Sequence, residues 1–237
     1  MTFGNSRCPE EFPAMSERAN KHGAIIFYSD QVIPANERLD RRFLEMINKD
    51  RPKLAYIPSA SDSTRRYYRE KCEYYKKYGI DDLLYFDLNK EYDPVLTEEL
   101  LACDAIHLSG GDPFQFLGSI RKRDFGSVLK KYLTNGGILL GISAGAIVLT
   151  PSINISHVFY RSRTDQQQAV GLVDFHFLPH LNQREGRLED VKRFSIENKA
   201  TVYACRDGAG MVIRGGKIEL VGDVMRIEKG KVFTNNE

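Results

Sequence analysis

The stretch GILLGISAGAIVL, residues 137–149, carries the strongest signal for the fold, because it sets one serine among glycine and alanine residues. An apolar run precedes Ser143, and Ala144, Gly145 and Ala146 follow it. A bulky side chain would clash at a tight turn, whereas these small residues allow the chain to turn tightly. We therefore expect a buried strand that ends at Ser143 and a helix that begins directly after it.

Short apolar runs, rich in β-branched and aromatic residues, alternate with amphipathic segments along the chain. Such runs occupy residues 24–29, 53–59, 82–88, 105–110 and 137–143. Uninterrupted apolar runs suit strands that are covered on both faces, and the spacing leaves room for crossover helices. Helices are predicted at 36–50, with Asn36 as N-cap, and at 61–79, with Gly79 as C-cap. The pattern is typical of a parallel α/β sheet with helices on both faces.

The sequence after residue 170 changes character. Three segments punctuated by Gly-Gly and Lys-Gly turns predict a C-terminal antiparallel extension; they cover residues 201–207, 211–222 and 225–234. The chain contains no internal repeat, low-complexity tract or linker. We therefore expect a polar N-terminal tail over residues 1–22 and a single α/β domain over residues 23–237.

Composition narrows the classes of partner. The 237 residues are 42% hydrophobic and carry a formal net charge of +2, so neither nucleic acid nor an anionic membrane is expected to bind. No run approaches the ~20 apolar residues of a membrane span, and the N-terminus lacks the apolar centre of a secretory signal. A cytoplasmic protein is therefore expected, and its oligomeric state, including a homodimer, stays open.

The cysteines and glycines of the chain predict neither a metal site nor a cofactor. The four cysteines are scattered without a C-x-x-C pair, and Cys103 and Cys205 are expected to be core thiols. Neither G-x-x-x-x-G-K-[ST] nor G-x-G-x-x-G occurs, which disfavours a nucleotide-binding protein.

The segment G-I-S-A-G has the form of a nucleophile elbow, in which the serine hydroxyl is exposed at a strand-to-helix turn. The N–H group after the serine can hold a developing oxyanion, and a helix N-terminus favours negative charge. The preceding apolar run also ends in a glycine turn, at Gly110 and Gly111, whose N–H groups could face an acyl oxygen above Ser143. Alternatively, the small residues only let a helix pack closely on the sheet.

A serine nucleophile needs a base, normally a histidine that a carboxylate orients. His22 lies in the tail, and His107 alternates within a predicted buried strand, where a core histidine is expected. His157 and His176 lie in short strand-like segments. His180 has the best setting, because it follows Pro179 at the end of an apolar strand, where a side chain can point into a cleft.

Three separated blocks resemble a known family of serine peptidases, the one that includes dipeptidase E, an aspartyl dipeptidase, and the cyanophycinases. The blocks are S-G-G-D-P-F-Q-F-L (109–117), G-I-S-A-G-A (141–146) and F-L-P-H-L-N (177–182), in the family's order. The resemblance covers roughly residues 23–225. It implies a fold similar to the class I glutamine amidotransferase domain, with a flavodoxin-like, mainly parallel sheet.

By this resemblance Ser143 is the nucleophile, His180 the general base, and the N–H groups of Gly111 and Ala144 the oxyanion hole. The family commonly has a glutamate in a late glycine-containing turn, where this chain offers Asp207 in A-C-R-D-G-A-G. The shorter aspartate can still orient an imidazole. The alternative acids are Asp165, Asp174 and Glu185.

The resemblance also implies a small peptide as substrate, with a preference for an acidic, aspartyl residue. Such a residue needs a cation, and Arg184 and Arg187 lie just past His180, while Arg161 and Arg163 form a second pair near the predicted cleft. These arginines could equally solvate a helix start. Gly110 and Asp112 are assigned to substrate binding as well.

The predicted function is therefore a serine peptidase that works through an acyl-enzyme. Two alternatives remain: a noncatalytic ligand-binding relative in which the histidine and acid have drifted out of register, and an esterase for small molecules on the same fold.

Overall fold

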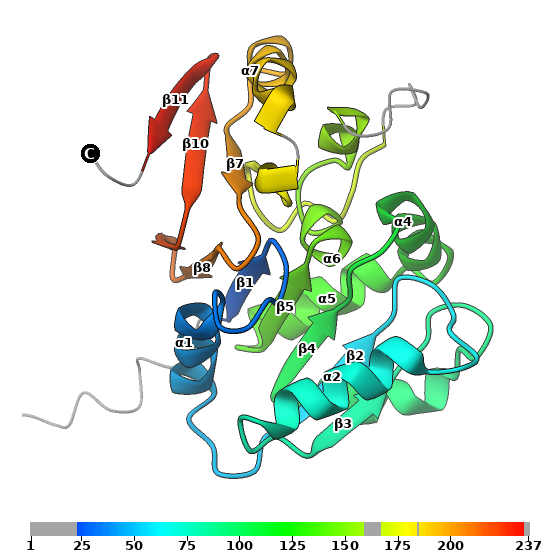
Figure 1. Ribbon diagram of the computed structural model, residues 1–237. Coiled ribbons are helices and arrows are strands. Elements are labelled where there is room, and N and C mark those ends of the chain that lie inside the picture. Colours follow the sequence, from blue (N-terminus) through cyan, green and yellow to red (C-terminus); the bar gives the residue numbers. More distant parts are fainter. Residues whose placement is uncertain (1–22, 159–166, 184, 235–237) are drawn as a thin grey trace, which may run out of the picture.

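A computed structural model describes residues 23–158, 167–183 and 185–234 of the chain (Figure 1). Its main sheet has seven strands in the order β3-β2-β4-β5-β1-β8-β9. The first five are parallel to one another, and they are β1 (Ala24–Tyr28), β2 (Lys53–Ile57), β3 (Asp82–Tyr85), β4 (Ala105–Leu108) and β5 (Ile138–Ile142). All five lie within the predicted apolar runs, and the predicted mainly parallel α/β sheet is confirmed.

Helices cover both faces of this sheet, because successive strand residues point to opposite sides. From β1, Ala24 and Ile26 pack into the cluster that holds the buried side chains of α1 (Glu37–Ile47) and α2 (Arg66–Lys76). Ile25 and Phe27 point the other way. Their cluster includes side chains of three further helices, α4 (Pro113–Lys122), α5 (Phe125–Thr134) and α6 (Ala144–Ile147).

The C-terminal region is divided between two sheets. The hairpin of β8 (Gly210–Arg214) and β9 (Lys217–Val221) adds to the main sheet, antiparallel to β1. A second sheet has the order β11-β10-β7-β6 and contains β6 (His176–Leu178), β7 (Val202–Cys205), β10 (Val224–Glu228) and β11 (Lys231–Thr234). The predicted antiparallel extension is confirmed, whereas the second sheet was not predicted.

The second sheet packs against β1 of the main sheet (Figure 1). The Phe27 ring lies 5.7 Å from the Phe175 ring and 5.2 Å from the Phe177 ring, centroid to centroid. Helix α7 (Leu188–Glu197) contacts β10. The remaining elements are short: α3 (Thr97–Leu101) and the 3₁₀ turns Pro94–Leu96, Asn154–Val158, Leu181–Gln183 and Glu185–Arg187.

Helix α2 starts five residues later than predicted, at Arg66 rather than at 61. Asp62 accepts hydrogen bonds from the Thr64 backbone N–H and hydroxyl, at 3.0 and 2.6 Å, and this local turn competes with helix formation. The helix ends at the C-cap Lys77 rather than at Gly79, which follows with a left-handed φ of 77°. Residues 61–65, which were predicted to be helical, belong instead to the loop between β2 and α2.

Asn36 stands at the predicted N-cap of α1, but its side chain does not cap the helix. It is buried, and its amide instead donates to the Asp40 carboxylate at 2.7 Å. The predictions of core thiols at Cys103 and Cys205 and of a core histidine at His107 are confirmed, since all three are at most 4% exposed. Within the described ranges, no helix is long and apolar enough to cross a bilayer.

Candidate active site

A cavity of about 730 Å³ opens where the carboxyl ends of β2, β4 and β5 meet. In the sheet, β2 is followed by β3 on one side and β4 is followed by β5 on the opposite side. The direction in which successive strands are added therefore reverses between the neighbours β2 and β4. Ligands of open α/β sheets bind at such a switch point. The cavity is lined by the loop after β2 (58–63), the turn after β4 (109–111), Ser143 and His180.

Ser143 follows β5 directly and is the N-cap of α6, at φ 51° and ψ −107°. A positive φ is costly for a serine and is found where the surroundings enforce it. Glycines on both sides make the turn possible: a Cβ on Gly145 would lie 2.1 Å from the Leu108 carbonyl oxygen, and one on Gly141 would lie 2.7 Å from the Ala146 Cα. The exposed serine and the close packing of the helix are therefore two results of one turn.

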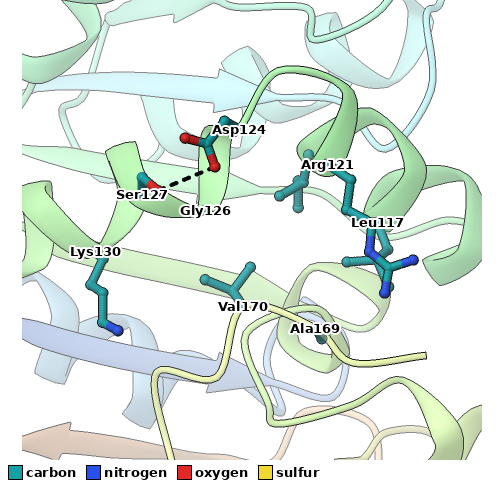
Figure 2. A pocket seen from close by; sticks show the side chains of 9 residues that line it. Leu117, Arg121, Asp124, Gly126, Ser127, Lys130, Ala169 and Val170 are labelled. Carbon is teal, nitrogen blue, oxygen red and sulfur yellow. Dashed lines mark hydrogen bonds between the residues drawn. The ribbon is translucent and has the colours of Figure 1, made fainter. Parts of the chain in front are cut away.

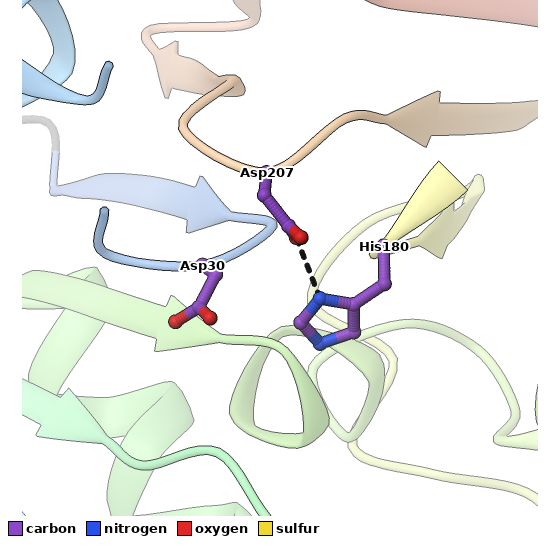
Figure 3. A group of neighbouring side chains, drawn as sticks. All are labelled: Asp30, His180 and Asp207. Atoms are coloured by element: carbon purple, nitrogen blue, oxygen red, sulfur yellow. Dashed lines mark hydrogen bonds and ion pairs between the residues drawn. The ribbon is translucent and has the colours of Figure 1, made fainter. Parts of the chain in front are cut away.

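Three side chains from distant parts of the chain form a continuous hydrogen-bonded path. Ser143 Oγ lies 2.8 Å from His180 Nε2, and His180 Nδ1 lies 2.6 Å from Asp207 Oδ1. Figure 3 shows the imidazole between the Asp207 carboxylate on the β7–β8 turn and the start of α6. The noncatalytic alternative expects these groups to be out of register, which is not the arrangement found.

Neighbouring amides keep the Asp207 carboxylate ionised. Partial burial alone would raise the pKa of Asp207, but hydrogen bonds from Asn182, Gln183 and His180 lower it below its usual value. The amides of Asn182 and Gln183 donate to Oδ2 at 3.0 and 2.8 Å, which leaves Oδ1 to the imidazole. The carboxylate therefore holds one tautomer of His180, the one with its proton on Nδ1.

Ser29, which follows β1, fixes the backbone around this path. Its buried hydroxyl accepts a hydrogen bond from the His180 backbone N–H at 2.7 Å, and it lies 3.2 Å from Asp207 Oδ1 and 3.1 Å from the Cys205 carbonyl oxygen. Sequence reasoning missed Ser29, Asn182 and Gln183. Asn182 stands in one of the blocks quoted above, whereas a serine after an apolar strand carries no local signal.

The glycine turn after β4 borders Ser143. A Cβ on Gly110 would lie 3.6 Å from the Ser143 Cβ, and Gly111 has a φ of 138°, which L side chains rarely adopt. Ala144 is buried behind the serine. The turn thus brings backbone beside the serine without a side chain between them.

The other residues predicted for substrate binding have different environments. Asp112 caps α4, because its Oδ1 accepts from the backbone N–H groups of Phe114 and Gln115 at 2.7 and 3.2 Å. Arg187 pairs with Asp190 at 3.2 Å. Among the described residues that line the cavity, neither Asp112 nor Arg187 appears. Residues outside the described ranges include Arg184, Arg161, Arg163 and the alternative acid Asp165, and also His22.

Two other histidines and one alternative acid are accounted for by packing or by exposure. The His157 ring stacks on Phe114 at 6.2 Å, and His176 is buried on β6, where burial lowers its pKa. The alternative acid Asp174 is exposed. Glu185 begins a 3₁₀ turn, and it is Asp207 that contacts the imidazole.

Asp30, His180 and Asp207 form a group whose ligand atoms all lie within 4.8 Å of one another (Figure 3). Such a group could in principle hold a metal ion. Both ring nitrogens of His180 already have partners, however, in Ser143 and Asp207. A cation ligated by this histidine would have to replace one of those two hydrogen bonds.

A smaller hollow of about 240 Å³ lies between α4, α5 and residues 169–170 (Figure 2). Arg121 and Lys130 line it, and the Asp124 carboxylate accepts a hydrogen bond from Ser127 at 3.2 Å. Its described lining contains no histidine beside a serine, so it lacks the chemistry of the larger cavity.

A serine at a strand-to-helix turn on a mostly parallel α/β sheet, hydrogen-bonded to a histidine, is the arrangement of serine hydrolases. Comparison with known proteins agrees with this class. The model of Peptidase family S51 matches residues 27–221, and the chain belongs to that family.

Relatives and a solved structure carry peptidase names. An uncharacterized peptidase from Pasteurella multocida is 28% identical over 54% of this chain and 64% of its own length, so the chain spans less than two thirds of it. Peptidase E from Nostoc sp. is 26% identical over 88% of this chain and 84% of its own. A putative peptidase E from Listeria monocytogenes has a TM-score of 0.66 at 21% identity, over 84% and 98% of the two chains. The last match supports the fold.

Proposed function

We propose that this chain hydrolyses small peptides with Ser143 as nucleophile, His180 as general base and Asp207 as the acid that orients the base. The single observation that carries the proposal is the hydrogen-bonded path from Ser143 Oγ through His180 to Asp207, with steps of 2.8 and 2.6 Å. These are the distances at which a base can take the proton of a nucleophile.

The reaction follows from this geometry. His180 Nε2 takes the hydroxyl proton as Ser143 Oγ bonds to the peptide carbonyl carbon, and the carbonyl oxygen becomes an oxyanion held by the N–H groups of Gly111 and Ala144. Each such donor lowers the barrier by about 3 kcal/mol. The imidazolium, stabilised by ionised Asp207, then gives its proton to the leaving amine. Water, deprotonated by His180, cleaves the resulting ester and restores the serine.

The charges in the cavity support a peptide with a free amino terminus as substrate. Asp30 lines the cavity, and its carboxylate lies within 4.8 Å of the ligand atoms of His180 and Asp207. A carboxylate near the scissile bond attracts a substrate ammonium group. This favours dipeptides and other short peptides over the interior of a long chain.

The preference for an acidic residue would rest on Lys71. Among the described residues that line the cavity, Lys71 is the one lysine or arginine, and its ammonium donates to Gln31 Oε1 at 2.7 Å. Arg187 is paired with Asp190 instead. A substrate carboxylate would therefore lie toward Lys71, whose ammonium group also interacts electrostatically with Asp30.

Turnover of a dipeptide panel by the purified protein tests the proposal. We expect wild type to hydrolyse Asp-X, Glu-X or neutral dipeptides, and Ser143→Ala to lose at least about 10⁴-fold in kcat. Ser127→Ala, an exposed serine at the smaller hollow, is the control and should match wild type. Undiminished turnover by Ser143→Ala would end the proposal, and turnover of esters alone would favour the esterase. The cytoplasmic location stays a prediction, and the oligomeric state stays open.

A further inference from the structure

Two hydroxyl groups converge on one backbone carbonyl of the glycine turn. Ser59, in the loop after β2, donates from its Oγ to the Gly110 carbonyl oxygen at 2.8 Å, and Ser109 donates to the same oxygen at 3.1 Å. The Ser59 backbone N–H donates to the Ser109 hydroxyl at 2.8 Å. Both serines are at most 8% exposed. A carbonyl oxygen has two lone pairs, so these two donors saturate it.

The direction of this carbonyl decides the direction of the next N–H group. A trans peptide unit is planar, and its C=O and N–H bonds point to opposite sides. When the Gly110 carbonyl points to the β2 loop, the Gly111 N–H must therefore point away from that loop. Ser143 lies beside the turn, since a Cβ on Gly110 would come 3.6 Å from the Ser143 Cβ.

A Gly-Gly turn does not hold this orientation by itself, because glycine adopts positive and negative φ about equally well. A flipped peptide would put the carbonyl oxygen of Gly110 where the oxyanion forms, and like partial charges would repel. The Ser59 side chain also packs closely against Gly111, because a Cβ on Gly111 would lie 2.1 Å from Ser59 Oγ. Only glycine leaves room for that hydroxyl.

We infer that Ser59 is a positioning residue: its hydroxyl holds the Gly110 carbonyl and so directs the Gly111 N–H toward the oxyanion that forms at Ser143. This inference rests on the proposed function, because it assigns Ser59 to the transition state of that reaction. Neither the glycine block nor the serine block contains Ser59, which comes from the loop after β2.

The test compares Ser59→Ala with Ser119→Ala in peptide hydrolysis. Ser119 is a matched control, because it is also buried (5% exposed) and donates to a backbone carbonyl, that of Gln115 at 3.0 Å, within α4. Loss of a whole oxyanion donor costs about 10²–10³-fold in kcat. Since Ser109 still holds the carbonyl, we expect Ser59→Ala to lose about 10- to 100-fold in kcat with KM changed less than about twofold.

A peptide boronic acid, whose adduct with Ser143 mimics the tetrahedral oxyanion, gives a second readout. Its inhibition constant should rise in Ser59→Ala by the same factor by which kcat falls, and Ser119→Ala should leave both near wild type. Melting temperatures of both variants separate catalysis from folding, and Ser59→Thr, which keeps the hydroxyl, should recover part of the rate if Ser59→Ala folds poorly.

Three outcomes would overturn the inference. One is unchanged kcat in Ser59→Ala while Ser143→Ala is dead, which leaves the proposed function intact. Another is a loss of rate with unchanged boronate affinity. The third is a wild-type protein without peptide turnover, which removes the proposed function and the inference with it.

Discussion

Two imidazoles of this molecule each lie against a hydroxyl group, yet they have opposite surroundings. His107 on β4 lies 2.7 Å from the Tyr75 hydroxyl, and His180 lies 2.8 Å from the Ser143 hydroxyl. His107 is 1% exposed, and burial together with the nearby Lys71 ammonium holds its pKa well below its usual value. His180 borders the cavity.

The difference shows that contact between a histidine and a hydroxyl does not by itself make a catalytic pair. His180 also has a carboxylate on its second nitrogen, whereas Nε2 of His107 is buried without a hydrogen-bond partner in the described structure. Only His180 can accept a proton, stabilise it with a neighbouring charge and reach a substrate. His107 is neutral and fills the core beneath α2.

Substituting each of the two histidines in turn should give the largest difference in kcat. His180→Ala should lower kcat by about 10⁴-fold or more with the melting temperature little changed, because its loss removes the base. His107→Leu should keep kcat within a few-fold and lower the free energy of unfolding by about 1–3 kcal/mol, because a buried hydrogen bond is lost. Steady-state kinetics and thermal unfolding measure both, and equal losses of rate would contradict the assignment.

The carboxylate on His180 can be tested next. Asp207→Asn should lower kcat by about 10³–10⁴-fold, because an amide cannot hold the Nδ1–H tautomer or stabilise the imidazolium. Asp207→Glu restores the charge one methylene further out and should retain more activity than Asp207→Asn. A rate for Asp207→Asn equal to wild type would show that another group orients the base.

Lys71 should affect specificity more than rate. Lys71→Met removes the ammonium and keeps an unbranched side chain, so the ratio of kcat/KM for Asp-X over a neutral dipeptide should fall about 5- to 10-fold. Arg187→Met is the control and should leave that ratio unchanged, because Arg187 is paired with Asp190. If Arg187→Met shifts the ratio and Lys71→Met does not, Arg187 rather than Lys71 recognises the acidic residue.

The smallest expected effect is on stability at acid pH. The pKa of Asp207 is lowered in the folded protein, so its ionised form stabilises the fold above the unfolded-state pKa of about 3.9. That contribution is lost as the pH falls through the folded-state value. The free energy of unfolding of wild type should therefore drop more steeply below about pH 4 than that of Asp207→Asn, whose amide does not titrate. Parallel curves would contradict the coupling.

The strands of the main sheet could be predicted because each is an unbroken apolar run, and burial on both faces demands that pattern. The second sheet could not, since β6 has three residues and its partner β7 lies beyond α7 in the sequence. The late start of α2 also escaped prediction, because the turn at Asp62 is a local competition that helical periodicity does not report.

The residues of the candidate site also fall into those that the sequence could predict and those that it could not. Ser143, His180 and the glycine turn stand in short blocks whose composition indicates their chemistry. Ser29 belongs to the site only because β1 pairs with β5, its neighbour in the sheet but not in the sequence. Ser59 likewise depends on β2 pairing with β4. Strand order, set by packing of the whole domain, was therefore needed to find the residues that hold the others in place.

Covalent labelling by a fluorophosphonate tests the central claim most directly, because it needs no knowledge of the substrate. Intact-mass analysis and peptide mapping of wild type should find one adduct, on Ser143, and His180→Ala should form it at least about 100-fold more slowly. A Ser143 hydroxyl that stays unlabelled in folded wild type, or that reacts equally fast without His180, would contradict the claim that this imidazole activates this serine.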